Sequence, residues 1–126
     1  MPVRVFQVAY NQQLLRVREM ILQQKGFTVH SVIGNSEACR LLGEEAFGDS
    51  RFDCFIIGWS GSYEEKKSIT EWIKQKWPTI PVVAIHDRFV KIPKADITAT
   101  HDTPEEWIRA VEAATRNFIS DQRLPT

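Results

Sequence analysis

The sequence has few cysteines, no excess of either charge and no long apolar run. Its 126 residues include two cysteines, and 16 lysines and arginines balance 16 aspartates and glutamates. Two cysteines cannot build a disulfide framework, so we expect a protein of the reducing cytoplasm. A net charge of zero argues against binding nucleic acid or an anionic membrane by bulk electrostatics. No apolar run approaches the roughly 20 residues of a membrane span. We therefore expect neither nucleic acid nor a membrane as a partner.

The chain also lacks an internal repeat, a linker and a low-complexity segment, which favours a single domain over residues 1–126. A chain of this length buries roughly two-thirds of its unfolded surface, enough for a true core. We expect residues 121–126 to form a frayed tail. The first ten residues have no long apolar segment ending in small residues, so no signal peptide is predicted.

Short apolar segments alternate with segments of helical periodicity. Strands are predicted at residues 3–9, 27–33, 52–57 and 80–85, with a weak fifth strand at 96–100. Helices are predicted at residues 14–25, 37–42 and 63–77, and a last helix follows Asp102. This alternation predicts a parallel sheet with helices on both faces. Five such units indicate a flavodoxin-like α/β fold, a three-layer sandwich around a five-stranded sheet of order 2-1-3-4-5.

The connection between the fourth and fifth strands is unusually short. Residues 87–95 are too few for a helix with a loop at each end, and Pro93 interrupts any helical pattern. We therefore expect the fourth helix of the fold to be missing or reduced to a turn. Its loss would uncover one face of the last two strands.

Two segments in the middle of the chain resemble the receiver domain of bacterial response regulators. Asp53 is followed by four apolar residues and Gly58, where the family has a strand running from one aspartate to the phosphoacceptor aspartate. Residues 78–83, Pro-Thr-Ile-Pro-Val-Val, match the run that opens the family's fourth strand. Weaker matches at residues 25–29, 37–42 and 104–106 extend the resemblance over nearly the whole chain. The resemblance therefore implies a receiver-like fold.

The resemblance also implies a phosphorylation site, but the reactive residue types are absent from it. Receivers carry two acids after the first strand, an aspartate after the third, a hydroxyl after the fourth and a lysine after the fifth. The corresponding positions here are Ala9, Tyr10, Gly58, His86 and, approximately, His101. Glycine offers no nucleophile, and Mg²⁺ lacks the carboxylates that it prefers. We therefore expect no catalytic residue, no metal site and no cofactor.

These observations predict a phosphorylation-independent receiver, or pseudo-receiver, that is not an enzyme. Its expected role is that of a protein-interaction module in bacterial signal transduction or regulation. The expected partner is a sensor kinase, a regulator or a second copy of the chain. Trp59 begins a loop, and a partly exposed tryptophan is a frequent anchor for a partner. Tyr63 and the fifth-strand residues Thr98 and Thr100 are further candidate contacts.

Two alternatives remain open at the level of sequence. In the first, the vacated acid pocket senses a small molecule or an ion; it is expected between Tyr10, Gly58, Trp59 and His86. In the second, the pairs His86–Asp87 and His101–Asp102 form a metal or acid–base site, because imidazoles and carboxylates are good zinc ligands. The second alternative is weaker, because adjacent side chains diverge and Asp102 is well placed to cap the last helix.

Overall fold

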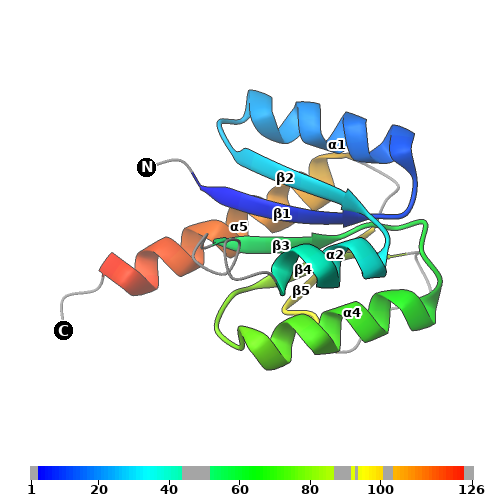
Figure 1. Ribbon diagram of the computed structural model, residues 1–126. Helices are drawn as coiled ribbons and strands as arrows, with labels where there is room; N and C mark the ends of the chain where they lie inside the picture. Colours follow the sequence, from blue (N-terminus) through cyan, green and yellow to red (C-terminus); the bar gives the residue numbers. More distant parts are fainter. Residues whose placement is uncertain (1–2, 44–51, 87–91, 93, 101–103, 124–126) are drawn as a thin grey trace.

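The computed structural model describes residues 3–43, 52–86, 92, 94–100 and 104–123. These residues form five strands and four helices, labelled as in Figure 1. The strands are β1 (Arg4–Ala9), β2 (Thr28–Ile33), β3 (Cys54–Ile57), β4 (Val82–His86) and β5 (Ile97–Thr100). The helices are α1 (Gln12–Gln24), α2 (Asn35–Leu42), α4 (Tyr63–Lys76) and α5 (Pro104–Arg123). Each corresponds to a predicted element, with shifts at its ends.

All five strands pair in parallel in the order β2-β1-β3-β4-β5, which confirms the predicted fold class. The central strands β3 and β4 are buried along their whole length, as their continuous apolar sequences indicate. The edge strand β2 is mostly exposed or half-buried. Because every strand runs in the same direction, all of them end at one edge of the sheet (Figure 1).

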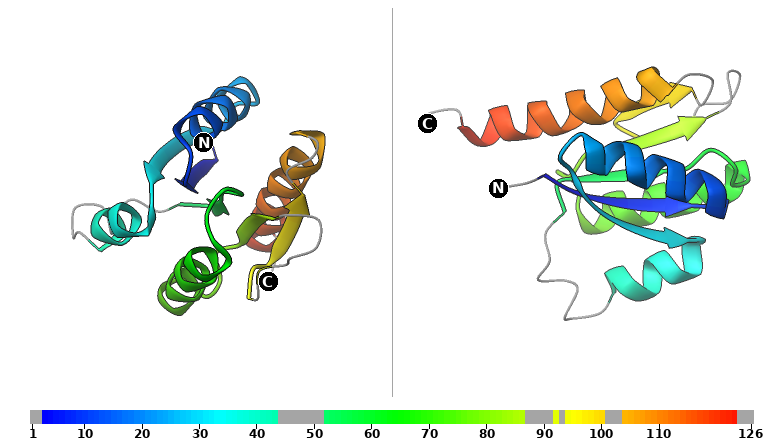
Figure 2. Two further views of the ribbon diagram at one scale, coloured as in Figure 1. Left: turned by 90° about the vertical axis from the view of Figure 1, so that its right-hand side faces the viewer. Right: turned by 90° about the horizontal axis from the view of Figure 1, so that it is seen from above.

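Helices cover both faces of the sheet (Figure 2). The buried side chains of the strands are divided between two cores, one on each face. One core lies under α2 and α4, where Phe55 and Ile57 of β3 pack with Ile69 and Ile73 of α4. The other core lies under α1 and α5. Its members include Cys54 and Ile56 of β3, Leu22 of α1, and Trp107 and Val111 of α5. The β3 sequence therefore supplies both cores by simple alternation.

The connection from β4 to β5 spans residues 87–96, of which Ile92 and residues 94–96 are described, and these form no helix. The expected loss or reduction of the fourth helix agrees with these residues, while residues 87–91 and 93 lie outside the described part. Lys94 adopts a left-handed backbone conformation with φ of 69°. That conformation is uncommon for a residue with a side chain, so the chain turns sharply just before β5.

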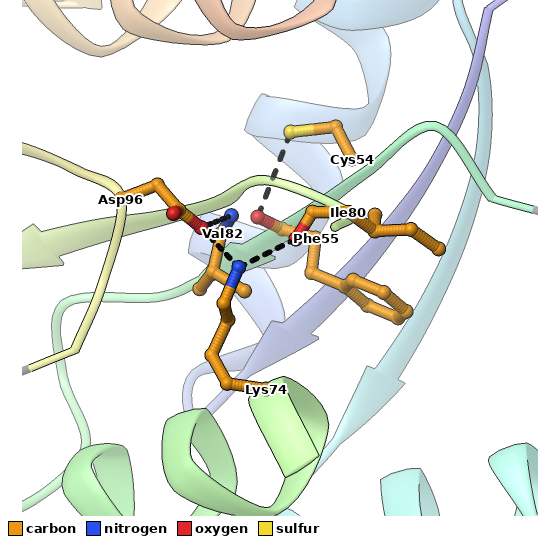
Figure 3. A network of polar contacts seen from close by, with 6 residues as sticks. All are labelled: Cys54, Phe55, Lys74, Ile80, Val82 and Asp96. Carbon is orange, nitrogen blue, oxygen red and sulfur yellow. Dashed lines mark hydrogen bonds and ion pairs between the residues drawn. The ribbon is translucent and has the colours of Figure 1, made fainter. Parts of the chain in front are cut away.

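A small polar network fastens the beginning of β5 to its neighbours (Figure 3). The Asp96 Oδ2 atom accepts hydrogen bonds from the Val82 backbone nitrogen and from Lys74 Nζ, both at 2.8 Å. Lys74 Nζ also donates to the Ile80 carbonyl oxygen at 3.1 Å. The Asp96 nitrogen donates in turn to the Val82 carbonyl oxygen at 2.9 Å. This reciprocal pair fixes where β5 starts against β4.

Asp53 makes the same pair of bonds at the beginning of β3. Its Oδ2 atom accepts from the Arg4 nitrogen at 2.9 Å, and its own nitrogen donates to the Arg4 carbonyl oxygen at 2.7 Å. The aspartate that opens the receiver-like segment therefore has a structural role here, since it sets the register of β3 against β1.

The last helix extends further than expected. α5 continues through Arg123, so the predicted tail begins inside the helix, and residues 124–126 lie outside the described part of the chain. Fraying of this tail remains a prediction. No helix within the described ranges is both long and apolar enough to cross a membrane.

Candidate functional site

The carboxyl ends of β1, β3 and β4 bring four of the expected site positions to one edge of the sheet. Ala9 is the last residue of β1, Gly58 follows β3, and His86 is the last residue of β4. Ala9, Gly58 and His86 are buried, and Tyr10 is partly buried. The fifth position, His101, lies outside the described residues. The structure thus places these four positions together at one edge, and the charged side chains beside them come from the neighbouring helices.

Gly58 lies directly against the guanidinium of Arg18, a residue of α1. A Cβ atom built on Gly58 would lie 2.9 Å from Arg18 Nη1, 3.2 Å from the Val8 carbonyl oxygen and 3.4 Å from the Ala9 Cα. Distances this short leave no room for a side chain unless the neighbours move. At the position that the resemblance equates with the phosphoacceptor, this chain therefore has a glycine in close contact with a buried cation.

The burial of Arg18 was not expected from the sequence. Its side chain is 4% exposed, and Nη1 donates a long hydrogen bond of 3.5 Å to Oε1 of the fully buried Gln7. Gln7 is held in place because its Nε2 donates to Ser31 Oγ at 3.0 Å and to the Leu15 carbonyl oxygen at 3.4 Å. Desolvation lowers the pKa of Arg18 to about 10, which leaves it charged at neutral pH.

Lys66 places a second cation at the same edge. The Ser62 side chain and the Glu65 side chain form a capping box that begins α4. Lys66, in the first turn, is buried, with 5% of its surface exposed. Its Nζ donates to the carbonyl oxygens of Trp59 at 3.0 Å and Ile85 at 3.4 Å. An ammonium group thus bridges the ends of β3 and β4.

Tyr10 closes the side of the edge nearest α2. Its hydroxyl donates to Asn35 Oδ1 at 2.6 Å, and Asn35 Nδ2 donates to the Glu65 carbonyl oxygen at 2.8 Å, so one chain of bonds joins β1, α2 and α4. A Cβ on Gly61 would lie 2.6 Å from the Tyr10 ring, so the ring packs flat against that glycine. Burial, followed by the nearby Glu65 carboxylate, raises the pKa of the Tyr10 hydroxyl.

The candidate partner contacts differ in how accessible they are. Tyr63 is 38% exposed at the start of α4. Trp59 is half-buried, because its ring packs against the core under α1 and α5. Thr98 is half-buried on β5, and the side chain of Thr100 lies outside the described part. Tyr63 is therefore the most accessible of the three candidate side chains that the structure describes, and Trp59 offers a partner only part of its surface.

The metal alternative falls largely on residues that the structure does not describe. Asp87, His101 and Asp102 lie outside the described ranges, and His86 is 4% exposed. Within those ranges, no three histidine, cysteine, aspartate or glutamate side chains gather as metal ligands would. A zinc or acid–base site at the two His–Asp pairs therefore remains a prediction.

Neither buried cation was predicted from the sequence, although the helical periodicity around each of them indicates a buried position. Lys66 precedes Ile69, Thr70 and Ile73 by three, four and seven residues, and all four are buried on one face of α4. On α1 the spacing of Leu14, Val17, Ile21 and Leu22 predicts one apolar face, but Val17 is 51% exposed and Arg18 is buried instead. The face is rotated by one residue, because Arg18 lies four positions before the buried Leu22.

Comparisons with known proteins agree with this architecture. No protein-family model matches the chain, and no curated protein has a significantly similar sequence. The signal receiver domain of an HD domain-containing protein from Pseudomonas fluorescens superposes with a TM-score of 0.77 over 95% of this chain and 99% of that chain, at 14% identity. The chemotaxis response regulator CheY4 of Vibrio cholerae gives a TM-score of 0.74 over 90% of this chain and 99% of its own, at 13% identity.

A third neighbour comes from a complex between two signalling proteins. A chain in the crystal structure of the histidine kinase ThkA with the response regulator protein TrrA gives a TM-score of 0.73 over 89% of this chain and 97% of that chain, at 14% identity. Identities this low establish a shared fold and nothing finer. The chain has the receiver fold, as the resemblance in its middle segments implies.

Proposed function

We propose that this protein is a phosphorylation-independent receiver that works as a protein-interaction module in bacterial signal transduction or regulation. In this proposal it is a cytoplasmic protein, is not an enzyme and needs no cofactor. The receiver fold and the fold's likeness to signalling domains support the assignment. The observation that carries it is Gly58, a residue without a nucleophile, where an added Cβ would lie 2.9 Å from the neighbouring Arg18 Nη1.

The charges at the strand edge argue in the same direction. Phosphoryl transfer to a carboxylate depends on a bound Mg²⁺ and on a positioned oxygen nucleophile. At this edge the described side chains supply the Lys66 ammonium and the Arg18 guanidinium, both nearly fully buried. A divalent cation would be repelled by them and would find Ala9 and Tyr10 where receivers place their acids. The alternative of a metal-ion sensor in the vacated acid pocket is disfavoured for the same reason.

The test is the response of the protein to beryllofluoride, which mimics a phosphoryl group on an aspartate. With Mg²⁺ and beryllofluoride added, the amide NMR spectrum is expected to match that recorded with Mg²⁺ and fluoride alone. A phosphorylatable receiver treated in parallel shows that the reagent is active. Saturable shifts at Gly58 and His86 would overturn the proposal, because they would show that the edge still accepts a phosphoryl group.

A second test concerns the protein partner. An affinity capture from cells of the source organism is expected to recover a sensor kinase or a regulator, and the structure of the ThkA complex makes a kinase a reasonable first candidate. Tyr63→Ala and Trp59→Ala should weaken that capture. Met20→Ala is the matched control, because Met20 is 61% exposed on α1 and away from the candidate contacts. If the three variants and the wild type capture the same proteins equally well, the assigned surface is wrong.

A further inference from the structure

A cavity lies between α1 and α5, beside the edge that carries Gly58. It has a volume of about 140 Å³, and Arg18 is the charged residue in its wall. The other lining residues are Leu14, Val17 and Ile21 of α1, Trp59 after β3, and Pro104 and Trp107 of α5. Val17 is half exposed and so lies at the rim, whereas Trp107 is 4% exposed and lies inside. The cavity therefore has apolar walls and one cationic side chain.

Arg18 is a buried cation without a carboxylate partner among the described residues. A guanidinium carries five N–H donors. In the described part of the chain its hydrogen-bond partner is the neutral Gln7 Oε1, at 3.5 Å. Burying a charge without a counter-ion is costly, and an anion that enters the cavity would lower that cost. Such an anion would meet a cation that is already desolvated and already positioned, which favours binding.

The size and the walls of the cavity restrict what this anion is. An apolar cavity of roughly 150 Å³ holds a benzene-sized molecule. The aromatic rings of Trp59 and Trp107 and the aliphatic side chains of α1 suit a flat ring or a short branched chain rather than a hydrated ion such as phosphate. The positive end of α5 adds little, because Glu105 and Glu106 already lie in its first turn.

We propose that this cavity binds a small monocarboxylate with an aromatic or branched aliphatic body, and that Arg18 pairs with the carboxylate. The apolar body lies against Trp59 and Trp107. This site lies beside the strand-edge pocket that receivers use for phosphorylation and shares Arg18 with that edge. It does not depend on the protein-partner function proposed above. Because Trp59 contributes to both the cavity and the candidate partner surface, an occupied cavity would couple a small acid to that surface.

The test uses benzoate and 3-methylbutanoate as probes, with benzamide as the neutral counterpart of benzoate. Binding is followed by NMR through the indole N–H signals of Trp59 and Trp107. At least one acid is expected to produce saturable shifts at both indoles, with a Kd of roughly millimolar or tighter. Benzamide is expected to bind about tenfold more weakly, since it lacks the charge that Arg18 recognises. This comparison needs no variant, so it stands even if a substitution at Arg18 impairs folding.

Two variants then test whether Arg18 is the residue that recognises the carboxylate. Arg18→Met should lose the preference for benzoate over benzamide, while Arg16→Met should keep it, because Arg16 is exposed on the same helix and does not line the cavity. Absence of saturable shifts with both acids overturns the proposal. Equal affinity for benzoate and benzamide in the wild type also overturns it. An equal loss in the two arginine variants does so too, because it would assign the preference to the general charge of α1.

Discussion

The close contact between Gly58 and Arg18 makes a quantitative prediction about Gly58→Ala. The new methyl group would lie 2.9 Å from Arg18 Nη1 and 3.2 Å from the Val8 carbonyl oxygen. The guanidinium is the end of a flexible side chain and can move, whereas Val8 belongs to the central strand β1 and cannot move freely. Overpacking of this kind costs about 1–3 kcal/mol. The reduced freedom of the unfolded chain returns about 0.4–1 kcal/mol, so the net loss of unfolding free energy is about 0–2.6 kcal/mol.

The part of this loss that belongs to Arg18 can be separated by a double-mutant cycle. Arg18→Ala removes the guanidinium, so Gly58→Ala should cost less in that background than in the wild type. The expected coupling energy is about 0.5–2 kcal/mol, and the Val8 contact should account for what remains. Arg16→Ala serves as the control background, because Arg16 is exposed on α1. There the cost of Gly58→Ala should equal its cost in the wild type.

Equilibrium unfolding in urea is the appropriate assay, with the slope of the transition checked for each variant. A coupling energy below about 0.5 kcal/mol would refute the reasoning, since independent sites add within that margin. The result also has a functional consequence. If Arg18 and Gly58 are coupled, every substitution that adds a Cβ at position 58, including Gly58→Asp, must displace the guanidinium before any phosphoryl chemistry is considered.

Three further predictions follow from other polar contacts. Lys66→Met should lower the unfolding free energy by about 1–3 kcal/mol, because two strand-end carbonyls lose their donor. Lys67→Met changes a less buried neighbour and should cost less than half as much. Equal losses in urea unfolding would contradict this prediction. Asp96→Ala should lower the unfolding free energy by about 1–2 kcal/mol and speed hydrogen exchange at the Val82 amide. Asp96→Asn should lower it less, because its amide oxygen still accepts a hydrogen bond from that nitrogen. Unchanged exchange in Asp96→Ala would contradict the network. The difference in unfolding free energy between the wild type and Tyr10→Phe should be constant below about pH 10 and should shrink above it by at most about 1.4 kcal/mol per pH unit. The reason is that the unfolded tyrosine releases its proton there, while the raised pKa keeps the folded one protonated. A difference that grows with pH in urea titrations would refute the assigned direction.

The fold was predictable because the sequence features that specify its strands and helices are local. Continuous apolar runs such as residues 54–57 specify strands that are buried on both faces, and the caps at Asn11 and Ser62 begin the helices that follow them. The alternation of strands and helices then leaves few ways to build a parallel sheet, because crossovers are right-handed and short. The positions at the strand edge followed from this topology, since parallel strands end together. Ala9, Gly58 and His86 meet there as expected.

The charged side chains buried at the site could not be predicted, because their burial depends on packing between elements that are distant in the sequence. Position 58 is a glycine in the sequence, but only the packing of α1 on β1 and β3 shows that a buried guanidinium fills the space beside it. Likewise, Lys66 belongs to a charged run that is typical of a solvent-exposed face, and only the packing of α4 on the sheet turns this one lysine inward. Helical periodicity determines which residues share a face, but the direction of that face is decided by the layer on which the helix packs. For this protein the sequence by itself determined the order of the elements and the absence of a side chain at position 58, while the tertiary structure decided which cations are buried at the strand edge and left an apolar cavity beside one of them.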